Sequence, residues 1–182
     1  LRWHHAERGF VPPSIFIPIA EEMGLIREIG AFVLRRSCED ALEWPIPLRV
    51  AVNVSYRQFV ADLPRLVGET LAEFGLPGSA LELEFTERVL IEDAPDTLET
   101  FAGLRQLGVL LVIDDFGEGY SALNYLRRLP IHGLKLSQLF VEGVPDNQSD
   151  VAVCQAVVGI AQQVQGLLLV ARRDVAGVDQ AE

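Results

Sequence analysis

The sequence predicts an α/β fold in which parallel strands alternate with helices. Short apolar runs typical of buried strands are separated by amphipathic runs typical of helices, which indicates parallel strands joined by helical crossovers. A doubly wound sheet and an eight-fold barrel both fit this alternation. Polar residues near the C-terminal ends of several strands favour a barrel, and no glycine-rich phosphate loop follows any strand. We therefore expect a barrel, of which this chain supplies five strands.

Three helices and two strands are expected in the first half of the chain. The helices are predicted from amphipathic periodicity, which places Ile26, Ile29 and Val33 on one face of the second helix. The strands are predicted from apolar runs, and the second strand alternates strictly between apolar residues and the acids Glu82 and Glu84. In chain order these elements cover residues 13–24 (helix), 25–42 (helix), 48–55 (strand), 62–74 (helix) and 80–86 (strand).

Three further helices and three further strands are expected in the second half. Asp93 followed by Pro95 is a helix start signal, and Ser149 is the expected cap of a long helix. The buried stripe of the first of these helices is predicted to comprise Leu98, Phe101 and Leu104 or Ala102. The inner face of the long helix is predicted to comprise Val153, Val157, Ile160 and Val164. The elements cover residues 95–107 (helix), 109–114 (strand), 121–128 (helix), 132–136 (strand), a helix from 149, and 167–171 (strand).

The bulk composition narrows the classes of function. With 182 residues, 49% of them apolar, one domain with a sizeable core is expected. A net charge of −11 and a pI of about 4.7 argue against binding a nucleic acid polymer. No apolar run approaches the length of a membrane span. The chain has two cysteines, Cys38 and Cys154, which lie far apart in the sequence and do not form a disulfide framework. This favours a location in the reducing cytoplasm. His4 and His5 share no metal-binding spacing and are expected in the loop after Trp3.

Four oxygen-bearing side chains stand near the ends of three successive strands. Asn53, Glu84, Asp114 and Asp115 offer only oxygen ligands, which suit hard cations such as Mg²⁺ or Mn²⁺. Two such ions can bind a phosphodiester and activate a water molecule, and Lys135 adds a positive charge for the phosphoryl oxygens. Alternatively, Asn53 is a hydrogen bonder of the barrel interior, and the glutamates belong to a solvated strand face. Because the four residues fall together on strand ends, a metal site is the favoured interpretation.

The motifs around these residues resemble those of the EAL domain. Residues 52–55 (Val-Asn-Val-Ser), 84–87 (Glu-Phe-Thr-Glu), 114–117 (Asp-Asp-Phe-Gly) and Lys135 have the order and spacing of that family. The opening Leu-Arg-Trp, the Pro- and Glu-containing segment at 11–22, and the Tyr-Leu-Arg-Arg-Leu-Pro run before the lysine also match it. The resemblance extends from Leu1 to about Ala171.

The resemblance implies a (β/α)8 TIM-like barrel, incomplete in this chain, and a metal-dependent phosphodiesterase of bacterial second-messenger signalling. The substrate would be cyclic di-GMP, opened to linear pGpG, and an intact domain would hold two Mg²⁺ or Mn²⁺ ions and form a homodimer. By matching position, Lys135 would be the catalytic lysine, Glu87 would steady the loop after Asp115, and Arg2 would contact a substrate phosphate. The implied metal ligands are Asn53, Glu84, Asp114 and Asp115.

The chain also departs from the EAL pattern. It begins just after the position of the signature Glu-Ala-Leu, so that glutamate and the first barrel strands are missing, as is the last strand. Where the family has a Glu-Gly-Val-Glu run, residues 172–175 read Arg-Arg-Asp-Val. Smaller departures are Glu118, Ala122 and Ser137. We therefore expect a partial EAL domain over residues 1–171, followed by a divergent tail over 172–182.

These departures leave three functions open at the level of the sequence. The first is a phosphodiesterase that is weak or inactive as this fragment. The second is a non-catalytic receptor of cyclic di-GMP or a protein-interaction module. The third, disfavoured by the flanking motifs, is proton abstraction next to a carboxylate on a metal-binding barrel. Because a barrel that lacks strands exposes sheet edges and apolar surface, the isolated chain is expected to be marginally stable or to self-associate.

Overall fold

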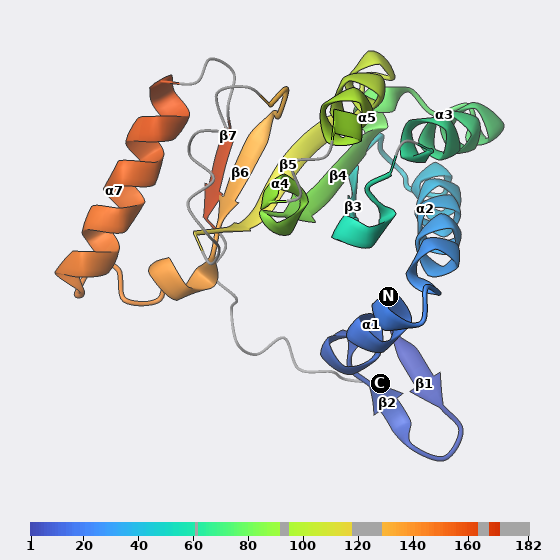
Figure 1. Cartoon of the computed structure of the whole chain (residues 1–182), viewed down its shortest axis with the longest axis horizontal. Coiled ribbons are helices and arrows are strands. Elements are labelled where there is room, and N and C mark those ends of the chain that lie inside the picture. Colours follow the sequence, from blue (N-terminus) through green and yellow to red (C-terminus); the bar gives the residue numbers. More distant parts are fainter. Residues whose placement is uncertain (61, 92–94, 118–128, 164–167, 172–182) are drawn as a thin grey trace.

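The fold is built around one parallel sheet (Figure 1), as the alternation of the sequence predicts. In the computed structural model, placement is described for residues 1–60, 62–91, 95–117, 129–163 and 168–171. The strands are hydrogen-bonded in chain order, each parallel to the next. Their bounds are β3 (Val50–Asn53), β4 (Leu81–Thr86), β5 (Leu110–Phe116), β6 (Gly133–Leu136) and β7 (Leu168–Ala171).

Helices connect the strands and cover the sheet. In Figure 1, α2, α3 and α5 lie beside β3 to β5, and α7 lies beside β6 and β7. The helices are α1 (Pro13–Glu22), α2 (Ile26–Leu42), α3 (Leu63–Phe74), α4 (Arg88–Ile91), α5 (Pro95–Gln106) and α7 (Gln148–Gln163). Short 3₁₀ turns cover Tyr56–Gln58, Gly78–Ala80 and Gln138–Phe140. The helix expected over 121–128 lies outside the described residues.

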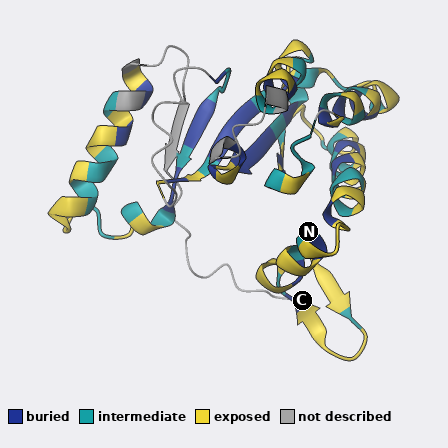
Figure 2. Ribbon diagram, in the orientation of Figure 1, coloured by how far each residue is buried: buried dark blue, intermediate teal, exposed yellow. Residues whose placement is uncertain are grey.

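The two faces of the sheet have different chemistry. Leu81, Leu83 and Phe85 of β4 are buried in the core, and the register places Leu83 and Phe85 level with Leu111 and Ile113 of β5. This side forms the core together with side chains from α2, α3 and α5. Figure 2 colours buried residues of these strands and helices dark blue. Because successive side chains of a strand alternate between faces, Glu82 and Glu84 lie on the opposite face. The core therefore leaves one face of the sheet for polar chemistry.

An antiparallel hairpin precedes the sheet and was not expected from the sequence. It consists of β1 (Trp3–His5) and β2 (Gly9–Val11), so His4 and His5 lie in a strand rather than in a loop after Trp3. The hairpin is held by ring contacts: Trp3 meets Phe16 of α1 at 5.7 Å between centroids. Three-residue, mostly exposed strands carry too short an alternation to be recognised in the sequence.

Two side-chain predictions for the helices were wrong. Leu98 of α5 is 52% exposed, whereas Phe101 and Leu104 are fully buried, so the buried stripe of α5 is narrower than expected.

Ser149 is not the cap of α7, because the helix begins at Gln148 and the backbone N–H of Ser149 donates to Asn147 Oδ1 at 2.9 Å. On the inner face of α7, Val157 is buried and Val153 packs against the core. The side chains of Ile160 and Val164 lie outside the described part of the chain.

Candidate functional site

The sheet register brings three of the predicted ligands to one face at the C-terminal ends of the strands. Asn53 of β3 lies level with Glu84 of β4, and Thr86 of β4 lies level with Asp114 of β5. Paired residues of parallel strands point to the same side, as do residues two apart on one strand. Asn53, Glu84 and Asp114 therefore share the face that is turned away from the helices. The backbone N–H of Val54 also donates to the carbonyl of Glu84 at 2.7 Å, which ties the end of β3 to β4.

A bulge in β5 lies at the two aspartates. The register with β6 shifts between Ile113 and Phe116, so Asp114 and Asp115 together face the stretch of β6 that contains Lys135. Asp115 has φ +51°, in the left-handed region, and its backbone N–H donates to Asp114 Oδ1 at 3.0 Å. Bulges redirect side chains, and strained backbone of this kind persists where the surroundings enforce it. Because of the bulge, β5 continues to Phe116 instead of ending at Asp114 as expected.

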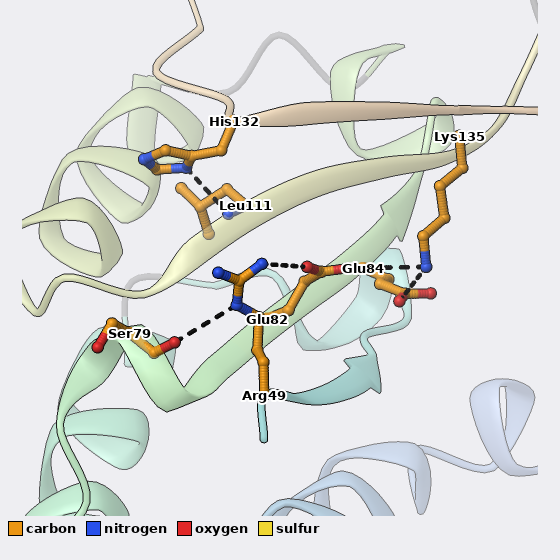
Figure 3. A network of polar contacts seen from close by, with 7 residues as sticks. All are labelled: Arg49, Ser79, Glu82, Glu84, Leu111, His132 and Lys135. Atoms are coloured by element: carbon orange, nitrogen blue, oxygen red, sulfur yellow. Dashed lines mark hydrogen bonds and ion pairs between the residues drawn. The ribbon is translucent and has the colours of Figure 1, made fainter. Parts of the chain in front are cut away.

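Lys135 forms the centre of a charged network on this face. Its ammonium, reaching across β5, contacts Glu84 Oε1 directly and lies 3.7 Å from Glu82 Oε1. Arg49 approaches Glu82 from the other side, at 3.4 Å from Oε2, and its Nε donates to the carbonyl of Ser79 at 3.4 Å. Figure 3 shows the lysine and the arginine converging on the two acids of β4. The network therefore alternates cation and carboxylate along the polar face.

Glu84 is the most deeply buried member of this network, with 5% of its surface exposed. Burial raises the pKa of its carboxyl group, Lys135 opposes that rise, and the nearby charges of Asp114 and Glu82 add to it. A buried carboxylate needs a compensating cation, and in this structure Lys135 supplies it. A divalent cation at the same oxygens would provide the same compensation.

Glu87 holds the loop that follows the bulge. The backbone N–H of Gly117 donates to Glu87 Oε1 at 2.8 Å, while Glu87 Oε2 is buried without a hydrogen-bond partner among the described residues. Gly117 has φ +104°, and a Cβ there would lie 2.6 Å from the ring of Phe140. A glycine is therefore required at 117, and the carboxyl of Glu87 fixes its position.

A cavity of about 550 Å³ adjoins the β3 side of the site. Asn53 and Glu84 line it, together with Glu21 of α1 and Ser55, whose hydroxyl donates to Glu21 Oε1. Gln58 closes a capping box, since its Oε1 accepts from the Ser55 backbone N–H. The turn after Asn53 is therefore held by one hydrogen bond to Glu21 of α1 and by a second one within the turn, between Ser55 and Gln58.

Arg2 stands apart from these residues. It is exposed, precedes β1, and lines a second, apolar cavity of about 460 Å³ with residues of α1 and α2. The two cavities share Leu1 and Ile29, so Arg2 lies beside the first cavity and not among its lining residues.

The side chains of the site are of the type that binds hard cations, but its carboxylates do not surround one common point. Among the described residues, no group of three or more His, Cys, Asp or Glu side chains is arranged to hold a metal ion. The donors on the shared face are the amide of Asn53 and the carboxylates of Glu84 and Asp114, which are oxygen ligands suited to Mg²⁺ or Mn²⁺. Lys135 engages Oε1 of Glu84, one of the two oxygens of that carboxylate.

Comparison with protein families matches residues 1–181 to the EAL domain. The chain belongs to the EAL domain family. A cyclic di-GMP phosphodiesterase of Pseudomonas aeruginosa is 41% identical over 172 residues, covering 90% of this chain and 29% of its own length. The uncharacterized protein y4lL of Sinorhizobium fredii is 43% identical over 164 residues, covering 90% of this chain and 20% of its own. The chain thus spans less than a third of the length of these relatives.

Solved EAL structures share the fold. The phosphodiesterase PaMucR, in complex with c-di-GMP, superposes with a TM-score of 0.85 at 37% identity, covering 93% of this chain and 70% of that one. The FimX EAL domain of Xanthomonas citri, also in complex with c-di-GMP, gives a TM-score of 0.83 at 20% identity, covering 97% and 70%. The architecture is therefore that of the EAL barrel, of which this chain is a part. None of its described helices is long and apolar enough to cross a membrane.

Glu82 and Arg49 were not singled out as functional residues from the sequence. The strict alternation of β4 had already placed Glu82 on the face of Glu84, so a signal was present. Its contact with Lys135 was not predictable, because it depends on the register of strands more than 50 residues apart in sequence.

Proposed function

We propose that this chain is the catalytic part of a cyclic di-GMP phosphodiesterase, hydrolysing one phosphodiester to give linear pGpG. The observation that carries the proposal is the convergence of Asn53, Glu84, Asp114 and Lys135 at one end of the sheet. It is supported by the 41% identity to a cyclic di-GMP phosphodiesterase. In the reaction a water oxygen attacks phosphorus, the bond from phosphorus to the 3′ oxygen breaks, and that oxygen leaves with a proton.

The residues of the site have distinct roles in this proposal. Asn53, Glu84, Asp114 and Asp115 would hold Mg²⁺ or Mn²⁺, which when bound polarises the phosphodiester and acidifies water. The ammonium of Lys135 orients the attacking water or neutralises charge that develops on the phosphoryl oxygens. Glu87 holds the loop after the bulge through Gly117, so that the aspartates keep their positions. Arg2, beside the cavity, would contact a phosphate of the substrate.

Separation of the cyclic and linear dinucleotides by chromatography tests the proposal. With Mg²⁺ or Mn²⁺ this chain should form pGpG slowly or not at all, and a version extended by the Glu-Ala-Leu segment of the family should form it readily. In the extended version, Lys135→Met should lower kcat by about 10²- to 10³-fold. The matched control is Arg65→Met, which removes an exposed cation of α3 and should leave turnover unchanged. Absence of turnover with either ion in the extended version would contradict the catalytic proposal.

A second candidate function is binding of cyclic di-GMP without cleavage. The observation that favours it is the ion pair between Lys135 and Glu84, because it occupies a side chain that is predicted to bind the metal. In addition, no group of three or more His, Cys, Asp or Glu side chains among the described residues is arranged to hold a metal ion. Calorimetry with the dinucleotide and Ca²⁺ separates the candidates. Tight binding together with absent turnover in Mg²⁺ would identify a receptor, whereas binding together with turnover would identify an enzyme.

A further inference from the structure

Lys135 faces two carboxylates of β4 on the polar face of the sheet. Its ammonium contacts Glu84 and lies 3.7 Å from Glu82, and both acids stand on the same side of the strand. The side chains of Lys135 and Glu82 are only 17% and 16% exposed, so neither charge is freely solvated. Lys135 is also the only lysine of the chain. One ammonium is therefore shared by two acids, of which Glu84 holds it more closely.

If Glu84 binds a cation, as the proposed function requires, its attraction for Lys135 weakens, because the ion neutralises the carboxylate and repels the ammonium. Leaving a largely buried ammonium without a partner is costly, and this cost would be subtracted from the affinity for the ion. Glu82 is the carboxylate placed to receive it, since a small side-chain movement closes the remaining distance. No predicted ligand role competes for Glu82.

Glu82 is itself fixed in a position suited to this exchange. Arg49 lies at 3.4 Å from Glu82 Oε2, whereas the atom nearest Lys135 is Oε1, so the two cations address different oxygens. Arg49 is anchored in turn by its bond to the carbonyl of Ser79. Glu82 can therefore accept Lys135 without giving up its own partner.

We propose that Glu82 is a positioning residue that takes over Lys135 when Glu84 turns to a divalent cation. The inference rests on the proposed function, because it assumes that Glu84 is a metal ligand. It assigns Glu82 no contact with the substrate or the ion. Glu82 keeps the lysine at the site in the loaded state and makes the carboxylate of Glu84 available.

Calorimetric titration of the full chain with Mn²⁺ tests this proposal. Glu82→Gln keeps the shape of the side chain and removes its charge, and it should weaken Mn²⁺ binding by about 10-fold or more, as loss of residues that support metal ligands does. The matched control is Glu73→Gln on α3, which breaks an exposed ion pair with Arg35 of α2 and should leave the affinity unchanged. Arg49→Gln, which loosens Glu82, should weaken binding by a smaller factor, about 3-fold.

A double-mutant cycle shows whether Glu82 acts through the lysine. In Lys135→Met, Glu84 has no ammonium to release, so adding Glu82→Gln should change Mn²⁺ affinity by less than about 2-fold. An equal loss in both backgrounds would mean that Glu82 attracts the ion by its own charge, and would overturn the proposal.

Selective isotope labelling of lysine adds a second readout. The Lys135 signal should shift on addition of Mg²⁺ in the wild type and lose that shift in Glu82→Gln.

The outcomes separate this inference from the proposed function. If the wild type binds Mn²⁺ and Glu82→Gln binds it equally well, Glu82 does not position the lysine, although the metal site stands. If the wild type and Glu73→Gln both fail to bind Mn²⁺, the metal-dependent function is wrong and the role of Glu82 falls with it. Should Glu82→Gln not fold, unchanged affinity in Arg49→Gln would overturn the inference.

Discussion

The two oxygens of Glu87 contribute differently to stability. Oε1 accepts the Gly117 backbone N–H, whereas Oε2 is buried without a partner among the described residues. Glu87→Ala leaves the Gly117 N–H unpaired and should lower the free energy of unfolding by about 1–3 kcal/mol. Glu87→Gln keeps an acceptor oxygen and should stay within about 1 kcal/mol of the wild type. Urea denaturation measures both, and equal losses in the two variants would contradict this account of the loop.

His132 predicts a dependence of stability on pH. Its Nδ1 accepts the Leu111 backbone N–H at 3.1 Å, which requires a neutral ring. Burial, with Arg105 and Arg49 nearby, lowers the pKa of His132 below its usual 6.5. The unfolded chain therefore binds a proton before the folded one does. The contribution of His132 to the free energy of unfolding is complete above about pH 6.5, the pKa of the unfolded chain. It is lost as the pH falls through the lower pKa of the folded protein.

Thermal unfolding over this pH range tests the role of His132. His132→Asn can present an oxygen in place of Nδ1 and does not titrate, so its midpoint should fall less than that of the wild type between neutral and mildly acidic pH. Parallel pH profiles for the two proteins would show that another group is responsible.

At the residue scale, the sequence predicted which side chains share a face of the sheet better than it predicted their contacts. The alternation of apolar and acidic residues predicted that Glu82 and Glu84 share one face of their strand. Asn53 and Glu84 were expected near the ends of neighbouring strands, and they are paired in the register of β3 and β4. The pairing of Lys135 with Glu84 was not predictable, because it crosses an intervening strand that contains a bulge. Local periodicity carries no information on such a shift of register.

At the scale of elements, α5 packs through an aromatic cluster. Phe101 is fully buried, with its ring centroid 4.6 Å from that of Phe59 and 5.0 Å from that of Phe85. Phe101→Ala should cost about 3–5 kcal/mol, because it leaves a cavity between α5 and the sheet. Leu98→Ala on the same helix is the matched control and should cost less than about 1 kcal/mol, since Leu98 is largely exposed. Similar losses of stability in the two variants would contradict the packing described for α5.

The long helices and the central strands were predictable because their periodicity extends over many residues. Smaller features were not: the β1–β2 hairpin is too short, and the start of α7 depends on which of two neighbouring polar residues accepts a backbone hydrogen bond. Asn147 and Ser149 are both acceptable caps by residue type, so only geometry distinguishes them.

At the scale of the whole molecule, an apolar surface surrounds the second cavity. Its exposed members come from the hairpin, α1 and α2, and include Trp3, Ile19, Met23 and Phe32. Such a patch favours association, which the net charge of −11 opposes only weakly in salt. We expect the isolated chain to form dimers or larger species as its concentration rises. Sedimentation velocity should show this, and Phe32→Lys should reduce it. A monomer at all concentrations would contradict the expectation.

The fold class was predictable as a whole because alternating strands and helices admit few arrangements. The choice of a barrel over a doubly wound sheet depended on where the polar residues stand, and the similarity to solved EAL structures confirms it. The position of the oxygen donors at one end of the sheet follows from the fold class, whereas the contact of Lys135 with Glu84 depends on the registers of β4, β5 and β6.

Anomalous diffraction from crystals grown with Mn²⁺ and cyclic di-GMP tests whether the oxygen donors of β3, β4 and β5 bind a divalent cation. We predict an anomalous peak about 2 Å from side-chain oxygens of Asn53, Glu84 and Asp114, with Lys135 moved from Glu84 toward Glu82. A map without a peak at these residues, in which Lys135 still contacts Glu84, would show that they do not form a metal site.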